Sequence, residues 1–221
     1  HDPTVVDQPF QWPATRPLSS LRVGFTKTGE PEDKCSDLKL LRELGVTLVP
    51  IELPESLPAS AVSMMLGTEA ATVFDELTRG HITEGLNSWP STFRRGQFVP
   101  AVEYLRASRV RTLLMRKMDD VMRDVDLYVG GDDLTITNLT GHPTVVFPDG
   151  FVERDGRKVP YSVTMTGRLF GESELLAVAN VFQTARGVNL ERPPIGEYLT
   201  AIMKEEKKPK SDESIDGNPQ Q

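Results

Sequence analysis

The sequence predicts an α/β fold in which helices flank a mixed, largely parallel β-sheet. Three patterns indicate this class: a strand, a short helix and a second strand follow one another within residues 21–51, a long amphipathic helix spans residues 100–123, and short apolar strands come after it. Strand–helix–strand units with tight connections are typical of parallel pairing, because parallel strands need a crossover. The 221 residues suffice for one large domain or two small ones with a substantial core.

The first unit begins with the apolar strand Leu21–Phe25. A helix follows, and Ser36 or Asp37 is its expected N-cap because short polar side chains satisfy the first free amides. Gly45 is expected to end this helix, and residues 46–51 form a second apolar strand. Three leucines at helical spacing give the helix its apolar face: Leu38, Leu41 and Leu44.

Two longer helices are expected in the middle of the chain. The first covers 59–79, and the second covers 100–123 with Pro100 in its first turn, where a proline is tolerated. The segment 81–96 between them contains two glycines and a proline besides polar residues, and it is expected to be irregular. The side chains expected to face the core at helical spacing are Val62, Met65, Leu66, Ala70, Val73, Phe74 and Leu77, then Val102, Leu105, Val110, Leu113, Leu114, Met118 and Val121.

The last elements are two strands, a hairpin and a helix. Residues 125–129 and 144–147 are apolar runs of strand length. Residues 151–166 are expected to form a hairpin that turns at Asp155-Gly156, a dipeptide that favours the two positive φ angles of a tight hairpin turn. An amphipathic pattern over 171–185 predicts the final helix.

Composition divides the chain into three parts. Residues 1–20 carry four prolines and predict an extended arm, residues 21–195 predict the folded domain, and residues 196–221 become so polar that the tail is expected to be disordered. The sequence opens on His1 without a methionine, so it is expected to be either a processed protein or a piece of a longer one.

Charge, cysteine content and the lack of a long apolar run disfavour several classes of partner and location. There are 25 basic and 32 acidic side chains, which disfavours a nucleic-acid backbone as the main partner because such binding needs a concentrated basic face. The single cysteine, Cys35, cannot form an internal disulfide, so a reducing, cytoplasmic location is expected. No apolar run approaches the ~20 residues that span a bilayer, so no membrane partner is expected.

Motifs for cofactors, metals and nucleophiles are weak. The segment Gly24–Glu30 has the two glycines of a phosphate loop, but Glu30-Pro31 replaces the lysine and hydroxyl that should follow. The three histidines are far apart in sequence and no cysteine pair exists, so no metal site and no cofactor are expected. No serine lies in the strained, glycine-rich setting that exposes a nucleophile, so no catalytic residue is assigned in this chain.

One basic concentration contains Arg94, Arg95, Arg106, Arg109 and Arg111. It either receives an anionic ligand or forms a solvated face, and the second interpretation is favoured. In that interpretation the arginines pair with nearby acidic residues, namely Glu103, Asp119 and Asp120.

The segment from Gly130 to Pro143 holds the best candidates for binding. Asp132 and Asp133 follow two glycines at the end of a predicted strand, where ligands bind in open α/β sheets. They either hold an amine or cap their own backbone amides. Turn-forming residues come next, and Pro143 keeps the preceding residue out of helical geometry. The candidates for substrate binding are Asp132, Asp133, Asn138, Thr140 and His142, although His142 is interpreted first as a structural turn residue.

Several stretches together resemble the amidase signature family, which includes bacterial amidases and the A subunit of glutamyl-tRNA(Gln) amidotransferase. The resemblance covers Asp2 to Pro194 and is most specific where "TNLTGHPTVVFPDGF" is followed by "VTMTGRLFGESELLAVANVFQ". It is supported by "DPTVVDQPF", "LRVGF" and "RRGQFVPAVEYLRASRVRTLL". The order of these stretches is that of the C-terminal half of such enzymes, so the resemblance implies the C-terminal half of an amidase-signature α/β/α fold.

The resemblance implies an activity and also what this chain lacks. Such enzymes hydrolyse amides or release ammonia from glutamine with a Ser-cisSer-Lys triad, in which no histidine takes part. No Gly/Ser-rich signature or lysine in the right context occurs here, so the triad is expected in an N-terminal half that precedes this sequence. The segment "GGDDLTIT" is shorter than in many members of the family, so substrate preference cannot be carried over.

Two functions follow as hypotheses. In the first, the chain is the pocket-forming part of an amidase or amidotransferase subunit that acts on a small amide and is inactive alone. Its partners are then the missing N-terminal half, a second copy in a homodimer, and tRNA or other subunits if it serves an amidotransferase. In the second, it is a non-catalytic, amidase-derived module that binds a small molecule or a partner protein.

Overall fold

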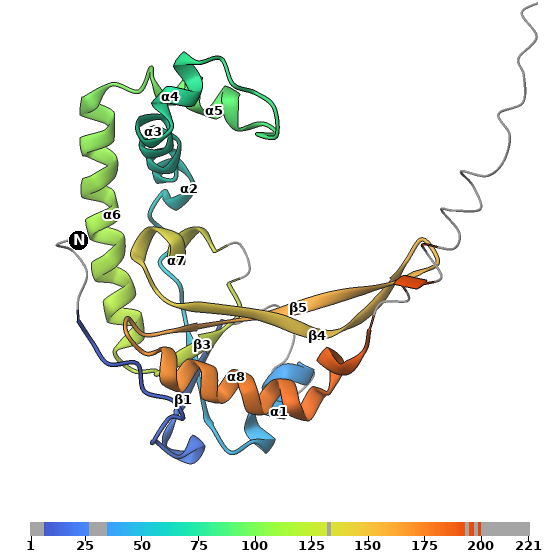
Figure 1. Cartoon of the computed structure of the whole chain (residues 1–221). Coiled ribbons are helices and arrows are strands. Elements are labelled where there is room, and N and C mark those ends of the chain that lie inside the picture. Colours follow the sequence, from blue (N-terminus) through green and yellow to red (C-terminus); the bar gives the residue numbers. More distant parts are fainter. Residues whose placement is uncertain (1–6, 27–34, 132–133, 193–194, 197–198, 200–221) are drawn as a thin grey trace, which may run out of the picture.

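The computed structural model describes residues 7–26, 35–131, 134–192, 195–196 and 199. Its centre is a five-stranded sheet with the order β2-β1-β3-β5-β4 (Figure 1). The strands are β1 (Arg22–Thr26), β2 (Thr47–Ile51), β3 (Leu127–Val129), β4 (Thr144–Arg154) and β5 (Arg157–Gly167). The helices are η1 (Leu18–Ser20), α1 (Ser36–Glu43), α2 (Ala59–Val62), α3 (Met64–Val73), α4 (Asp75–Arg79), α5 (Trp89–Gly96), α6 (Ala101–Met122), α7 (Thr135–Thr140), α8 (Glu172–Arg186) and η3 (Val188–Leu190).

The predicted mixed sheet is confirmed. Strand β1 lies between β2 and β3 and is parallel to both, with α1 as the crossover from β1 to β2. Strand β5 is antiparallel to β3 and to β4. Parallel pairing is therefore confined to β2, β1 and β3. The pairing of β4 with β5 is antiparallel, as expected for two strands joined by a hairpin.

Helices cover both faces of the sheet (Figure 1). On one face, α1 and α8 bury Leu41 and Phe182 against the strands. On the other face, the C-terminal part of α6 buries Met118 and Met122. Strand β3 serves both layers, since Leu127 belongs to the first cluster and Tyr128 to the second, as the alternation of side chains along a strand requires. No described helix is long and apolar enough to cross a membrane.

The ends of α1 differ in part from the prediction. Gly45 has a φ of 91°, the left-handed conformation expected just after a helix. The N-cap is Cys35 rather than Ser36 or Asp37, and its side chain makes no capping hydrogen bond. Asp37 instead forms an ion pair with Arg186 of α8, which explains why its carboxylate is not available as a cap.

The segment 59–79 is not one helix, and the prediction was wrong there. It consists of α2, α3 and α4, with breaks at Ser63 and Phe74. Phe74 leaves helical geometry and packs on Phe93 of α5, with 5.3 Å between the ring centroids. Leu66 and Val73, expected in the core, are 62% and 74% exposed.

The segment 81–96 was predicted to be irregular, but its second half forms α5. Proline suits the first turn of a helix, and Pro90 occupies that position. The ring of Phe93 is buried and lies 5.6 Å from that of Trp89. Aromatic packing against α3 and α4 therefore stabilises a helix in a segment rich in helix breakers.

The long helix α6 is confirmed at residues 101–122, directly after Pro100. Its core contacts are fewer than predicted, because Val102 and Leu105 are exposed and only its C-terminal part lies on the sheet. Its N-terminal half runs beside α2 and α3, away from the sheet (Figure 1).

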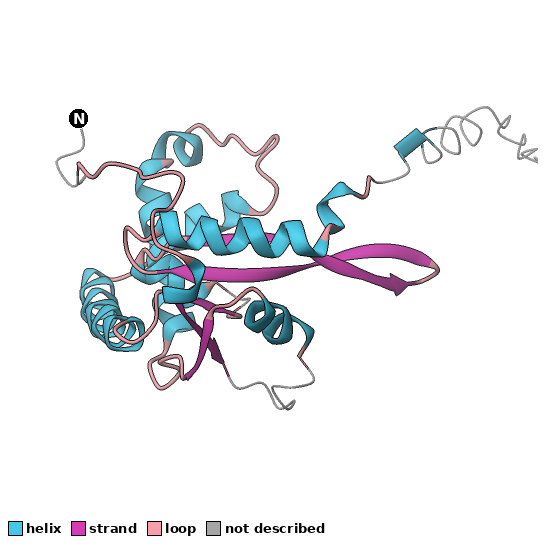
Figure 2. Ribbon diagram, turned by 90° about the horizontal axis from the view of Figure 1, so that it is seen from below, coloured by secondary structure: helices cyan, strands magenta, loops and turns pink. Residues whose placement is uncertain are grey.

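The hairpin turn at Asp155-Gly156 is confirmed, with φ angles of 51° and 71° at these two residues. The strands are longer than predicted, since β4 continues from Thr144 through Pro148 to Arg154. The register shifts between Pro148 and Gly150, and this irregularity accommodates a proline on an edge strand. The hairpin projects beyond α1 and α8 (Figure 2), and Lys158 of β5 forms an ion pair with Glu191 just after η3.

The described part of the proline-rich arm, from Asp7 to Pro17, contains no helix or strand. It is fixed by Arg16, whose Nη1 donates to Oδ1 of the buried Asp126 at 2.6 Å. The other oxygen of Asp126 accepts the backbone N–H of Arg22 at 2.8 Å. Burial alone would raise the pKa of Asp126, but these donors outweigh it and hold the pKa below its usual value. The tail predicted to be disordered lies almost entirely outside the described residues.

We expect the substitution Asp126→Asn to lower the free energy of unfolding at pH 7 by about 1–3 kcal/mol, because it removes a buried charged acceptor. The depressed pKa means that the carboxylate stabilises the fold above the unfolded-state pKa, and that this contribution is lost as the pH falls below about 4. Urea unfolding at several pH values measures both effects. Asp124→Asn is the control, because Asp124 is exposed and lies 3.8 Å from its partner Arg22. An equal loss in the two variants would contradict the assignment.

We also expect opposite effects from adding a methyl group to the two glycines where α5 meets α3. A Cβ at Gly96 would lie 2.4 Å from the carbonyl oxygen of Gly67, so Gly96→Ala should lower the free energy of unfolding by about 1–3 kcal/mol. A Cβ at Gly67 would meet only a methyl group of Thr92, at 3.4 Å, so Gly67→Ala should be neutral or stabilise the helix by up to about 1 kcal/mol. Thermal unfolding of both variants tests the packing of α5 on α3.

Candidate functional site

The segment that follows β3 is built around two glycines in conformations that other residues rarely adopt. Gly130 has a φ of 103° and Gly131 a φ of 77°. A Cβ at Gly131 would lie 3.3 Å from the ring of Tyr128, so the backbone passes close to that ring. The segment thus turns sharply at the carboxyl end of the parallel strands, which is where ligands bind in open α/β sheets.

The polar residues after these glycines form the short helix α7 rather than the predicted turn. The helix starts after Leu134 and ends at Gly141, both in the left-handed conformation. The hydroxyls of Thr137 and Thr140 donate to the carbonyls of Leu134 and Ile136, which bonds these side chains to their own helix. His142 lies outside the helix, as expected for a residue before a proline.

The predicted binding residues do not form one wall. Asp132 and Asp133 lie outside the described residues. Asn138 is exposed and lines a cavity of about 320 Å³ between α7, α3 and α6. Thr140 and His142 line a different cavity, of about 260 Å³, beside the C-terminal part of α6. A substrate-binding role for any of the five residues stays a prediction.

The contact between Thr140 and His142 fixes the proton on the imidazole ring. The Thr140 hydroxyl has one proton, and the carbonyl of Ile136, 2.9 Å away, can only accept it. His142 Nδ1, 2.7 Å from the same hydroxyl oxygen, must therefore carry a hydrogen and donate it. The neutral ring then has its lone pair on Nε2. Burial lowers the pKa of His142, and the charge of Asp119 offsets this only in part.

Two arginines of the predicted basic group, Arg106 and Arg111, make contacts within the protein. Arg106 pairs with Glu103 at 2.7 Å, as expected for a solvated helix face. Asp120, by contrast, pairs with Arg123. Arg111 donates its Nε to the carbonyl of Leu139 at 2.6 Å, so it holds the C-terminal end of α7 against α6.

Sequence reasoning missed Arg168, which lines the cavity of His142. Its Nε donates to the carbonyls of Met122 and Val125, at 3.0 and 2.6 Å, and its Nη2 to that of Arg123 at 3.2 Å. A cation is favourable at the C-terminal end of a helix, where carbonyls lack partners. The signal was present in the "TGRLFGE" stretch, but nothing in the sequence indicates that its arginine reaches the end of α6.

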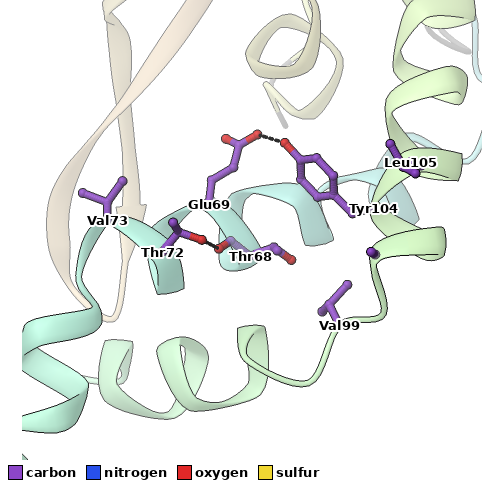
Figure 3. Close-up of a pocket in the computed structure, with 8 residues that line it drawn as sticks. Thr68, Glu69, Thr72, Val73, Val99, Tyr104 and Leu105 are labelled. Carbon is purple, nitrogen blue, oxygen red and sulfur yellow. Dashed lines mark hydrogen bonds between the residues drawn. The ribbon is translucent and has the colours of Figure 1, made fainter.

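A third and larger cavity, of about 620 Å³, lies between α3 and the start of α6 (Figure 3). Its walls are mostly apolar and include Val73, Val99 and Leu105. Glu69 lines both this cavity and the one beside Asn138. Among the described side chains, no group of three or more His, Cys, Asp or Glu residues could hold a metal ion.

We expect His142 to titrate below the ordinary histidine range and to carry its proton on Nδ1 when neutral. Because its folded pKa is depressed, the neutral ring stabilises the fold above the unfolded-state pKa, and this contribution is lost as the pH falls through the folded pKa. Nitrogen-15 NMR of the imidazole rings measures the titration and the tautomer, and His142→Gln assigns the signals. Thr140→Val should remove the preference for Nδ1–H, and an unchanged tautomer there would contradict the hydrogen-bond assignment.

No family model matches the sequence, but individual proteins and solved structures are similar to it. The A subunit of glutamyl-tRNA(Gln) amidotransferase from Chloroflexus aggregans is 28% identical over 236 residues, which covers 82% of this chain and 48% of that protein. The same subunit from Chloroflexus aurantiacus is 26% identical and covers 87% of this chain and 51% of that protein.

Solved structures share the fold at lower sequence identity. A bacterial aryl acylamidase of the amidase signature family has a TM-score of 0.62 at 15% identity, covering 80% of this chain and 47% of that one. Allophanate hydrolase from Kluyveromyces lactis has a TM-score of 0.63 at 14% identity, covering 82% of this chain and 35% of that one. The chain spans about half the length of the curated relatives it matches. The chain is thus similar in sequence to these amidotransferase A subunits and similar in fold to an enzyme of the amidase signature family, and its partial coverage of them fits a C-terminal part.

Proposed function

We propose that residues 21–195 are the C-terminal, pocket-forming part of an enzyme that hydrolyses a carbon–nitrogen amide bond. The observation that carries this proposal is the similarity to amidotransferase A subunits over 82% of the chain, combined with a fold that amidases share. The substrate is a small amide, in a free amidase or in an amidotransferase subunit.

The bond-breaking groups belong, in this proposal, to polypeptide that precedes His1. The relatives are about twice as long as the matched stretch, which leaves room for a Ser-cisSer-Lys triad. Within the described ranges no hydrogen bond joins a serine hydroxyl to a lysine amine, and the described serine hydroxyls that donate do so mainly to backbone carbonyls of nearby residues. A nucleophilic serine needs an activating base within reach.

The candidate contribution of this chain is the wall around α7. Asn138 presents a side-chain amide that can donate and accept at once, which suits a substrate that is itself an amide. Arg111 of α6 holds the end of α7, and a fixed helix orients Asn138 better than a mobile loop would. Asp132, Asp133, Thr140 and His142 are the other candidates for contact with substrate.

A non-catalytic binding module is the second candidate function. It is favoured by exposed apolar side chains on the helical part of the chain, such as Phe74, Phe98 and Val102. Such side chains fit a surface that another polypeptide covers, either the preceding half or a second copy. A cytoplasmic location, a homodimer and tRNA or amidotransferase partners stay predictions.

We expect the 221-residue chain to hydrolyse no simple aliphatic or aryl amide, whereas the protein extended upstream hydrolyses at least one of them. The measurement is the release of ammonia or arylamine by both purified proteins at equal concentration. Replacing the upstream signature serine with alanine in the longer protein is the control and should abolish turnover.

Two results would count against the proposal. Serine-dependent turnover by the 221-residue chain would place the reacting groups here. A longer reading frame without a Gly/Ser-rich signature and a lysine would favour the binding module.

A further inference from the structure

We propose that the cavity between α3 and the start of α6 binds a small primary amine that carries an aryl or alkyl group. In this proposal the apolar group contacts some of the side chains Val73, Val99 and Leu105, and the ammonium group contacts the carboxylate of Glu69. Figure 3 shows these side chains around the cavity, with Glu69 directed at Tyr104. The proposal rests on the cavity's volume, its apolar walls and one negative charge at its edge.

The walls are more apolar than their composition indicates. Two threonines of α3 line the cavity, but each donates its hydroxyl to a backbone carbonyl of its own helix, Thr68 to Met64 at 3.2 Å and Thr72 to Thr68 at 3.1 Å. These hydroxyl groups are therefore already satisfied as donors. Val73 and Leu105 are large apolar side chains that remain 74% and 63% exposed, and a ligand that covered them would remove apolar surface from water.

The polar group in the cavity selects the charge of the ligand. Glu69 accepts the hydroxyl of Tyr104 through Oε1 at 2.8 Å, and this hydrogen bond raises the pKa of Tyr104. The charge of Arg111 acts on this pair and lowers the pKa of Tyr104 in part, but its Nε donates to the carbonyl of Leu139 and not to Glu69. The second oxygen can accept from an ammonium group. A carboxylate in the same place would be repelled.

Arg111 is a cation that lines the neighbouring cavity together with Glu69. Its Nε is held by the carbonyl of Leu139 at 2.6 Å, on the side of α7. The apolar cavity, at about 620 Å³, lies within the size range of small-molecule sites.

The binding proposal depends only on residues of this chain. The interpretation of the amine as one product of amide cleavage rests on the proposed function. Hydrolysis and amine binding are measured separately, so failure of one leaves the other intact.

Titration of the nitrogen-15-labelled 221-residue chain tests the proposal with matched probes. Benzylammonium should bind in the millimolar range, with shifts confined to α3 and to residues 99–105. Benzoate, which has the same ring and the opposite charge, should bind at least about fivefold more weakly. Methylammonium, which has the charge without the ring, should not reach saturation. Equal binding of benzoate, shifts elsewhere, or no binding of benzylammonium would overturn the proposal.

Single substitutions measure separately how much the charge of Glu69 and the apolar wall contribute to the affinity for benzylammonium. Glu69→Gln should weaken benzylammonium by about two- to fivefold and leave benzoate no weaker than before, the range expected for an exposed ion pair. Leu105→Ser should weaken benzylammonium about three- to fivefold through lost apolar contact. Tyr104→Phe should bind it at least as tightly as the natural chain, because it removes a competing donor from Glu69.

The control is Glu76→Gln, which makes the same charge change at an exposed position of α4 outside the cavity. It should leave the affinity unchanged. If Glu76→Gln weakens binding as much as Glu69→Gln, the net charge of the protein attracts the amine and the proposal is wrong. The spectrum of each variant without ligand is recorded first, to check that the variant is folded.

Discussion

Asp126, through its buried carboxylate and its backbone, joins the proline-rich arm, the start of β1 and the residue after β5. It accepts the side chain of Arg16 from the arm and the backbone N–H of Arg22 at the start of β1, while its own N–H donates to the carbonyl of Arg22. Its carbonyl accepts the N–H of Arg168, which follows β5. A buried carboxylate must be paired with donors, so the arm and the first strand have to meet at this residue. The end of the hairpin is held there by the backbone hydrogen bond from Arg168.

Local patterns predicted the parts of the fold that local chemistry decides. Gly45 and Asp155-Gly156 adopt positive φ angles, and Pro100 precedes a helix, because these preferences belong to the residues themselves. The break at Phe74 and the helix at Trp89 could not be predicted in this way. They depend on aromatic packing between α4 and α5, and the spacing of residues along one segment contains no information about the other.

The sequence predicts which segment holds the candidate binding residues, but not which of them lie on the same cavity. Asn138 and Thr140 are two residues apart, and in a helix this spacing places them about 200° apart around the axis. The sequence predicts both as binding residues of one turn-forming segment, in which both could face one side. Once α7 forms, Asn138 lies on one cavity and Thr140, with His142, on another. The ion pair between Arg186 and the buried Asp149 could not be predicted either, because their positions along the chain reveal nothing of their distance of 2.8 Å.

The helix α6 contacts α3, α7 and the sheet. Tyr104 and Arg111 are seven residues apart, so they lie on one face, about 10 Å apart along the axis. The first bonds Glu69 of α3 and the second bonds the end of α7, while Met118 and Met122 anchor the same helix to the sheet. Arg168 holds the carbonyls at its C-terminal end. Residues of α6 therefore line all three of these cavities, and the contact of its C-terminal part with the sheet fixes where these walls lie relative to the parallel strands.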